Sequence, residues 1–239
     1  MSFFARIFSQ STSTNIPADL SALKCDVHSH FIPGIDDGAQ TMDDSVALIK
    51  SFYDLGYKKV ITTPHILADG YPNTPEIILS GLEKVRVALK NENIPIQIEA
   101  AAEYYIDFDF DRKIEQEKLL TFGKNYLLFE VSYINPPDNL ERIIFKLLTS
   151  DYKPVLAHPE RYPFWSGNFK RFEQLKEKGV LFQLNINSLT GYYSRQTKKT
   201  EHQRKRKQGF SQKKPRMHHR QRINSQTDPR HKCRNRISP

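Results

Sequence analysis

The chain has 239 residues, of which 38% are hydrophobic and 26% are charged, so it can form one large domain or two small ones with a sizeable core. No apolar run approaches the roughly 20 residues of a membrane helix, and residues 1–20 lack the continuous apolar core of a secretory signal. The formal net charge of +9 is uneven, because residues 195–239 carry sixteen basic and two acidic side chains, whereas residues 1–194 carry twenty basic and twenty-five acidic ones.

Strand-like and helix-like segments alternate over residues 24–191. In chain order the strand-like segments are residues 24–30, 58–65, 94–105, 126–132, 153–161 and 180–188. The helix-like segments are residues 42–56, 74–93, 138–151 and 168–179, with an irregular acidic stretch at 107–117. This alternation predicts a parallel α/β architecture. Strands this apolar suit either a barrel or a doubly wound sheet, and periodicity does not separate the two.

The composition divides the chain into three parts. Residues 1–22 are predicted to form an N-terminal arm, either a short surface helix or a frayed segment, and residues 23–194 the folded domain. Residues 195–239 have no amphipathic period and almost no aliphatic side chains. Such a segment cannot bury enough apolar surface to offset its ordering entropy, so we expect a disordered basic tail.

Six side chains of the folded domain lie at the carboxyl ends of predicted strands. They are His28, His30, His65, Glu103, Glu130 and His158. Ligands bind at that edge in α/β barrels and open α/β sheets alike, and His28 and His30, two residues apart in a strand, point to the same side. Buried carboxylates without a partner are costly, so the six together predict a metal site. One histidine at a strand end would more often be an ordinary polar residue.

The mixture of imidazoles and carboxylates suits Zn, Mn, Fe or Co. Six candidate ligands are too many for one tetrahedral ion, so we expect two or three ions that share a bridging water. Such a centre generates hydroxide at neutral pH and stabilises an in-line displacement at phosphorus.

Three further charged residues lie near these strand ends. Asp36 and Asp37, in the sequence GIDDG, fall on the first strand-to-helix loop. Asp36 either orients a ligand or protonates a leaving group, and a simple turn is the alternative. Arg161, three residues after His158, can bind phosphate bidentately or be an ordinary surface arginine.

The two cysteines do not suggest thiol chemistry. Cys25 and Cys233 are far apart and predict no disulfide framework, which fits a reducing compartment such as the cytoplasm. Neither begins a C-x5-R phosphate loop, and no P-loop or dinucleotide-binding glycine pattern is present.

Five segments together resemble a known family. They are DVHSHFIPGIDDGAQTMDDS, ITTPH, AAAEYY, LLFEVS and AHPERY, and they are similar to the bacterial PHP-type (polymerase and histidinol phosphatase) manganese-dependent protein-tyrosine phosphatases of the capsular polysaccharide group. The resemblance runs from about Cys25 to Tyr193. It implies a distorted (β/α)7 barrel with a trinuclear Mn²⁺ centre in the cytoplasm, in which the six strand-end residues are metal ligands and Arg161 binds phosphate.

The resemblance also implies a substrate and a role. The substrate would be phosphotyrosine on a partner protein, a bacterial tyrosine kinase that regulates capsular or exopolysaccharide biosynthesis. The ester would be hydrolysed by a metal-bound hydroxide.

The carboxyl-terminal part departs from the family. The family ends in a seventh strand with a G-x-D-x-H block that supplies an Asp and a His to the metals, and no such block follows GYYS at 191–194. We hypothesise a shift of reading frame close to Ser194, which the coding DNA would test. The expected domain therefore lacks its last strand, leaves a sheet edge open and has impaired solubility and activity.

Two alternatives remain open at this point. The first is another metal-dependent phosphoesterase with an H-x-H first strand, such as a histidinol phosphatase or a barrel nuclease. The second is an inactive scaffold whose tail makes non-specific contacts with nucleic acid through counterion release. The tail has one aromatic residue, Phe210, and no nucleic-acid-binding motif.

Overall fold

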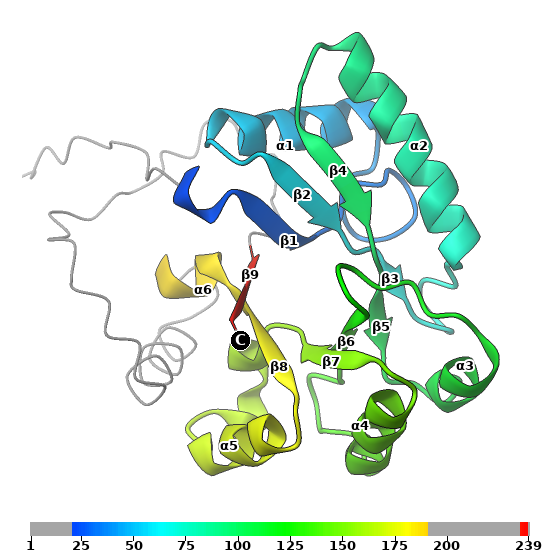
Figure 1. Ribbon diagram of the computed structural model, residues 1–239, viewed down its shortest axis with the longest axis vertical. Coiled ribbons are helices and arrows are strands. Elements are labelled where there is room, and N and C mark those ends of the chain that lie inside the picture. Colours follow the sequence, from blue (N-terminus) through cyan, green and yellow to red (C-terminus); the bar gives the residue numbers. More distant parts are fainter. Residues whose placement is uncertain (1–20, 191–234, 239) are drawn as a thin grey trace, which may run out of the picture.

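The computed structural model describes residues 21–190 and 235–238 (Figure 1). Its strands are β1 (Cys25–Ser29), β2 (Lys59–Thr62), β3 (His65–Ile66), β4 (Gln97–Ala100), β5 (Glu103–Tyr105), β6 (Tyr126–Glu130), β7 (Lys153–Leu156), β8 (Leu181–Asn185) and β9 (Asn235–Ser238). Its α-helices are α1 (Met42–Asp54), α2 (Pro75–Asn91), α3 (Phe110–Gln116), α4 (Leu140–Thr149), α5 (Phe169–Glu177) and α6 (Ile186–Thr190). Short 3₁₀ turns are η2 (Ser21–Leu23), η3 (Pro159–Arg161) and η4 (Pro163–Trp165).

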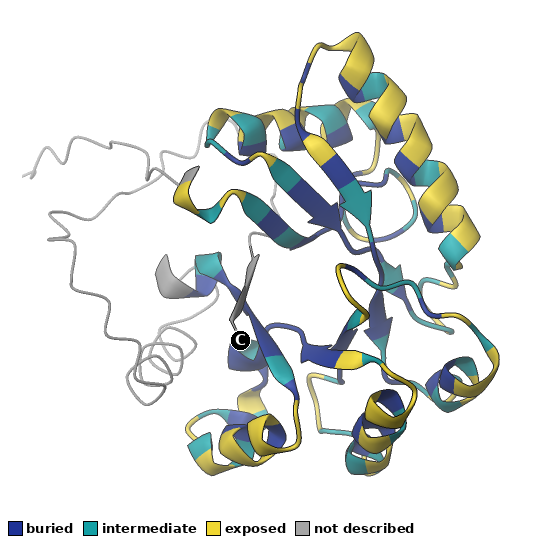
Figure 2. Cartoon of the chain, viewed as in Figure 1, coloured by how far each residue is buried: buried dark blue, intermediate teal, exposed yellow. Residues whose placement is uncertain are grey.

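The strands form two sheets, in the orders β1-β2-β4 and β3-β5-β6-β7-β8-β9. Neighbouring strands are parallel throughout, apart from the antiparallel pair of β8 and β9. Helices α1 to α5 cover the outside of the strands, and the buried residues gather on the side that faces inward (Figure 2). The predicted parallel α/β architecture is confirmed.

Two predicted strands, residues 58–65 and 94–105, are each divided in the structure. Pro64 has no N–H to donate, so ladder pairing of the first segment stops after Thr62. Pairing resumes across the break, where Glu103 N donates to Pro64 O (3.0 Å) and His65 pairs with Glu103. The chain thus passes from one sheet to the other and sets two of the predicted ligands side by side.

Three segments differ from the sequence prediction. Residues 107–117 were expected to be irregular but contain α3, because Phe110 and Ile114 are one helical turn apart and both are buried. The last predicted strand, residues 180–188, ends at Asn185, and α6 follows. Residues 235–238 fall in the tail expected to be disordered and beside the edge expected to be open, yet they pair with β8. Backbone hydrogen bonding to a strand edge depends little on side chains.

The calls for the N-terminal arm and for most of the tail lie outside the described residues. The hypothesis of a shifted reading frame near Ser194 therefore stays a prediction.

The helices begin at polar caps that the sequence supplies. Thr41 and Asp44 form a reciprocal capping box at the start of α1, and Thr74 accepts a hydrogen bond from Ile77 N at the start of α2. Helix α4 buries one apolar face, including Ile143 and Leu147. Among the described residues, no helix is both long enough and apolar enough to span a membrane.

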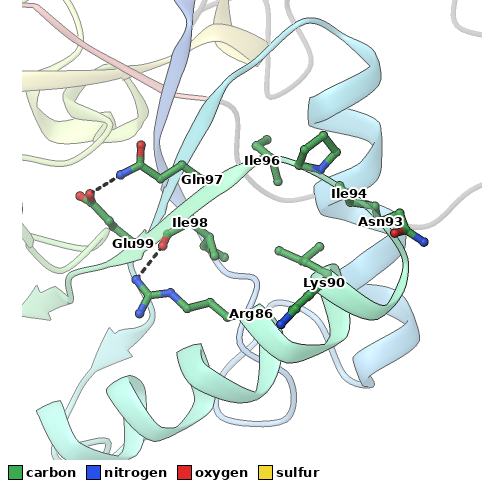
Figure 3. A pocket seen from close by; sticks show the side chains of 10 residues that line it. Arg86, Lys90, Asn93, Ile94, Ile96, Gln97, Ile98 and Glu99 are labelled. Atoms are coloured by element: carbon green, nitrogen blue, oxygen red, sulfur yellow. Dashed lines mark hydrogen bonds between the residues drawn. The ribbon is translucent and has the colours of Figure 1, made fainter.

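The outer edge of β4 is covered by a side chain of α2. Arg86 Nη2 donates to Ile98 O (2.9 Å), and Gln97 Nε2 donates to Glu99 Oε1 (2.9 Å) on the same strand. A groove of about 570 Å³ lies between the carboxyl end of α2 and β4 (Figure 3). A charged side chain over a free strand edge opposes pairing with another chain.

The contact between α2 and the first loop provides a test of the packing. Alanine is ordinarily favoured over glycine within a helix by about 1 kcal/mol, but a Cβ on Gly81 would clash with the Cγ2 atom of buried Ile32. We therefore expect Gly81→Ala to lower the free energy of unfolding by about 1–3 kcal/mol in denaturant titration. The control Ser80→Ala, on the exposed side of the same turn, should be neutral or slightly stabilising. A stabilised Gly81→Ala variant would contradict this packing.

Candidate metal centre

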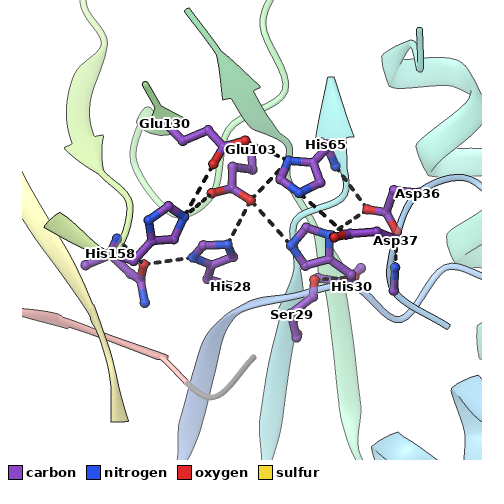
Figure 4. A network of polar contacts seen from close by, with 12 residues as sticks. His28, Ser29, His30, Asp36, Asp37, His65, Glu103, Glu130 and His158 are labelled. Carbon is purple, nitrogen blue, oxygen red and sulfur yellow. Dashed lines mark hydrogen bonds and ion pairs between the residues drawn. The ribbon is translucent and has the colours of Figure 1, made fainter. Parts of the chain in front are cut away.

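Four imidazoles surround one buried carboxylate at the carboxyl ends of the strands (Figure 4). A Glu103 carboxylate oxygen lies 2.9 Å from His28 Nε2, 3.4 Å from His30 Nε2, 3.3 Å from His65 Nδ1 and 3.0 Å from His158 Nε2. Glu130 joins the group, 3.1 Å from His65 Nδ1 and 3.5 Å from His158 Nε2. The structure thus brings together all six side chains that the sequence singled out.

Two of the histidines have backbone conformations that are rare outside glycine. His28 has φ 87° and lies at an irregularity in the pairing of β1 with β2, so His28 and His30 do not belong to one regular strand. His158 has φ 33° and ψ 52°, directly after β7. Left-handed conformations of this kind cost of order 1–3 kcal/mol and cluster at functional sites. Here they aim two imidazoles at Glu103.

The loop after β1 holds His30 through a carboxylate. Asp36 Oδ2 accepts from His30 Nδ1 (2.6 Å) and from His65 N (3.1 Å). Gly38 N donates to Asp36 Oδ1 (2.9 Å), and a Cβ on Gly38 would clash with the backbone of His30, so the residue after the two aspartates must be glycine. Asp37 is more exposed and lies 3.6 Å from His65 Nε2.

Gln183 on β8 joins two of the histidines, although the sequence analysis did not identify it. Its Oε1 atom accepts from His28 Nδ1 (2.7 Å) and from His158 N (3.1 Å), and its Nε2 atom donates to Asn185 Oδ1 (3.3 Å). The signal in the sequence was one uncharged polar residue inside an otherwise apolar strand, which is too common to single out.

The position of Gln183 also tests whether a cation fits. Because Gln183 Oε1 can only accept, the hydrogen of a neutral His28 ring is on Nδ1 and a lone pair on Nε2 faces Glu103. Two acceptors 2.9 Å apart need a proton or a cation between them. Asp36 fixes His30 in the same sense, with Nε2 toward Glu103, as is usual for histidines that ligate metals.

The pKa values follow from burial set against these charges. Burial alone would raise the pKa of Glu103, but the neighbouring imidazoles, His28 and His65 first, hold it well below its usual value. Burial and the charge of Glu103 raise the pKa of Glu130, and hydrogen bonds from His158 and His65 outweigh both. Burial lowers the pKa of His28. Burial also opposes the charge on His158, but hydrogen bonds to the two glutamates raise its pKa to about 9.

Three overlapping groups have ligand atoms within 4.8 Å of one another, close enough to hold a cation. They are His28, His30 and Glu103; His30, Asp37 and His65; and His65, Glu103 and Glu130. Sharing of His30, His65 and Glu103 between groups suits neighbouring ions with bridging ligands. Nitrogen and oxygen donors together favour Zn, Mn, Fe or Co over Ca²⁺.

Arg161 lies beside this cluster, in η3 directly after His158. Its Cζ atom lies 5.1 Å from the centroid of the Tyr133 ring, and the Tyr133 hydroxyl lies 3.3 Å from His158 Nδ1. Tyr133 was not identified from the sequence.

Comparison with known proteins points to one group. A family model described as "Capsular polysaccharide synthesis, CpsB/CapC" matches residues 24–210. The chain is 29% identical over 174 residues to the tyrosine-protein phosphatase YwqE of Bacillus subtilis, covering 72% of the chain and 68% of YwqE. It is 29% identical over 161 residues to the tyrosine-protein phosphatase CpsB of Streptococcus pneumoniae, covering 67% of the chain and 66% of CpsB.

A solved structure is similar to the present one with a TM-score of 0.69 and 29% sequence identity, covering 74% of this chain and 72% of the other. It comes from a description of YwqE and CpsB as unique metal-dependent tyrosine phosphatases. The matches thus span about two thirds of the length of the curated relatives.

Gln183→Leu removes the acceptor that fixes His28 and leaves the N–H of His158 without a partner. We expect the affinity for Mn²⁺ or Zn²⁺, measured by calorimetric titration, to fall about 10- to 100-fold, as is usual when a group that orients a ligand is lost. Gln174→Leu, an exposed glutamine on α5, is the matched control and should bind metal normally. Unchanged affinity in Gln183→Leu would mean that the His28 ring is oriented by other contacts.

The raised pKa of His158 predicts a pH dependence with a definite sign. A histidine whose pKa rises from 6.5 to about 9 on folding stabilises the chelated protein fully below about pH 6.5 and progressively less toward pH 9. Thermal unfolding in EDTA should therefore show a lower Tm at pH 9 than at pH 6.5, and His158→Gln should reduce that difference. Because metal ions displace these protons, the rise in Tm caused by added metal should grow over the same range. A metal-induced rise that shrinks toward pH 9 would contradict the assignment.

Proposed function

Because the chain belongs to the CpsB/CapC family of capsular polysaccharide synthesis proteins, we propose that it is a metal-dependent protein-tyrosine phosphatase that hydrolyses phosphotyrosine. The observation that carries this proposal is the convergence of four imidazoles on Glu103 and Glu130 at the carboxyl ends of the strands. That edge is where α/β folds place their ligands.

The six converging side chains are the proposed metal ligands, with Asp37 as a further candidate. Two or three divalent ions, Mn²⁺ by resemblance to the family, would supply a nucleophilic hydroxide at neutral pH and neutralise charge on the phosphoryl group. Arg161 is the proposed phosphate-binding residue, because its planar guanidinium can donate two parallel hydrogen bonds to phosphoryl oxygens.

Asp36 is assigned to orientation of His30. Burial tends to raise its pKa, but the charge of His30 and the hydrogen bonds from His30, Gly38 and His65 leave it lowered. An ionised carboxylate that is already hydrogen bonded is a poor proton donor. Of the two roles considered for Asp36, protonation of the leaving group is therefore the less favoured.

The finer assignments of fold and partner belong to this proposal. The two sheets, with helices outside them, are a distorted (β/α)7 barrel, and the substrate is a phosphotyrosine on a bacterial tyrosine kinase that regulates capsule or exopolysaccharide synthesis. The protein acts in the cytoplasm. Contact of the basic tail with nucleic acid is non-specific and lies outside the described residues.

Histidinol phosphatase activity is the less favoured alternative, because the curated relatives reported above are tyrosine-protein phosphatases. Substrate comparison separates the two. A phosphotyrosine peptide should be hydrolysed with a higher kcat/KM than histidinol phosphate.

Turnover of a phosphotyrosine peptide by the full chain should require added Mn²⁺ and stop in EDTA. Because Glu103 contacts all four imidazoles, Glu103→Gln should lower kcat/KM by about a hundredfold or more. Glu99→Gln is the matched control, since Glu99 lies on the preceding strand and pairs with Lys59.

The rate should also be lower than that of YwqE measured alongside, because the sequence lacks the G-x-D-x-H block of the family. Absence of metal-dependent turnover with every substrate would contradict the proposed function, and a rate equal to that of YwqE would contradict the predicted impairment.

A further inference from the structure

An aromatic stack leads from the candidate metal centre to the surface. The rings of His158 and Tyr133 are stacked, with centroids 5.8 Å apart and planes at 14°, and Tyr162 packs against both. His158 and Tyr162 are 2% and 1% exposed, whereas Tyr133 is 38% exposed. Tyr133 is therefore the member of this stack that meets solvent.

The same ring is next to the proposed phosphate-binding residue. The Arg161 guanidinium lies over the Tyr133 ring, 5.1 Å from its centroid, which is within the range of a cation–π interaction. The Tyr133 hydroxyl is also 3.3 Å from His158 Nδ1. One side chain thus contacts both a candidate metal ligand and the candidate phosphate-binding group.

Large apolar side chains are exposed beside Tyr133. Ile134 is 87% exposed on the same loop after β6, and Phe108 is 77% exposed on the loop after β5. The bases of the two loops are joined by a hydrogen bond from Ile106 N to Glu130 O (3.0 Å). Leaving these side chains in water is unfavourable unless they contact something else in the working protein.

We propose that Tyr133 and Ile134 form an aryl subsite that binds the phenyl ring of an aryl phosphate, while the Tyr133 ring holds Arg161 toward the phosphate. The inference rests on the proposed function and names the part of its substrate that is recognised. A phosphate bound at Arg161 and the metal centre directs its ester group toward solvent, past Tyr133. A phenyl ring is long enough to pack on this surface, whereas the side chain of phosphoserine ends before it.

Direct binding tests the subsite without depending on turnover. The ligands are O-phospho-L-tyrosine, O-phospho-L-serine and inorganic phosphate, titrated calorimetrically into the full chain with Mn²⁺. We expect phosphotyrosine to bind about tenfold more tightly than phosphoserine. Ile134→Ser should weaken phosphotyrosine binding about three- to tenfold and leave phosphate binding unchanged. Phe145→Ser, an exposed phenylalanine on the outer face of α4, should change neither.

Variants of Tyr133 separate its two contacts. Tyr133→Leu should weaken both phosphotyrosine and phosphate about three- to tenfold, because Arg161 loses the ring beneath it. Tyr133→Phe keeps the ring and should retain phosphate affinity. Circular dichroism melting would show whether a Tyr133 variant is folded, and Ile134→Ser decides the question if it is not, since Ile134 is almost fully exposed.

Equal affinity for phosphotyrosine and phosphoserine, no binding of either, or an unchanged preference in Ile134→Ser would overturn the proposal. The outcome is separate from that of the proposed function. Preference for the aryl ligand without hydrolysis would support the subsite and contradict the enzyme, whereas hydrolysis without that preference would do the reverse.

Discussion

A carboxylate with no exposed surface, that of Glu103, lies within 3.4 Å of four imidazoles. Removing such a group from water is costly unless positive charge compensates it. The rest of the site follows from this constraint. His28 and His158 adopt backbone conformations that are costly in themselves, and Asp36 and Gln183 hold imidazole rings in one orientation. Local strain is accepted so that several chain segments meet at one carboxylate.

The parts of this site that the sequence predicted were those fixed by strand order. All parallel strands of a sheet end at the same edge, so His65, Glu103, Glu130 and His158 could be brought together without coordinates. The division of residues 58–65 and 94–105 into shorter strands was not predicted, because it depends on Pro64 losing one partner while neighbouring residues find others. Helix α3 was missed because its acidic residues concealed two apolar positions, Phe110 and Ile114, one turn apart.

Orientation was less accessible than proximity. The spacing of His28 and His30 indicated that both face one side, and they do, but the irregularity in β1 at His28 is a tertiary effect that periodicity does not contain. Gln183 is far from its partner His28 in sequence, and Tyr133 acts through ring stacking. Both are uncharged, so they gave no electrostatic signal comparable to that of a buried glutamate.

The bridge from Gln183 to His28 and His158 has a consequence for synthesis of the protein on the ribosome. Its three members come from the first strand, the loop after β7 and β8, so the complete coordination cage cannot form while the nascent chain still has β8 inside the exit tunnel. An ion captured earlier would meet only a subset of donors and bind weakly. Metal selection is thus a late event, made from whichever cations are available when the polypeptide closes on itself.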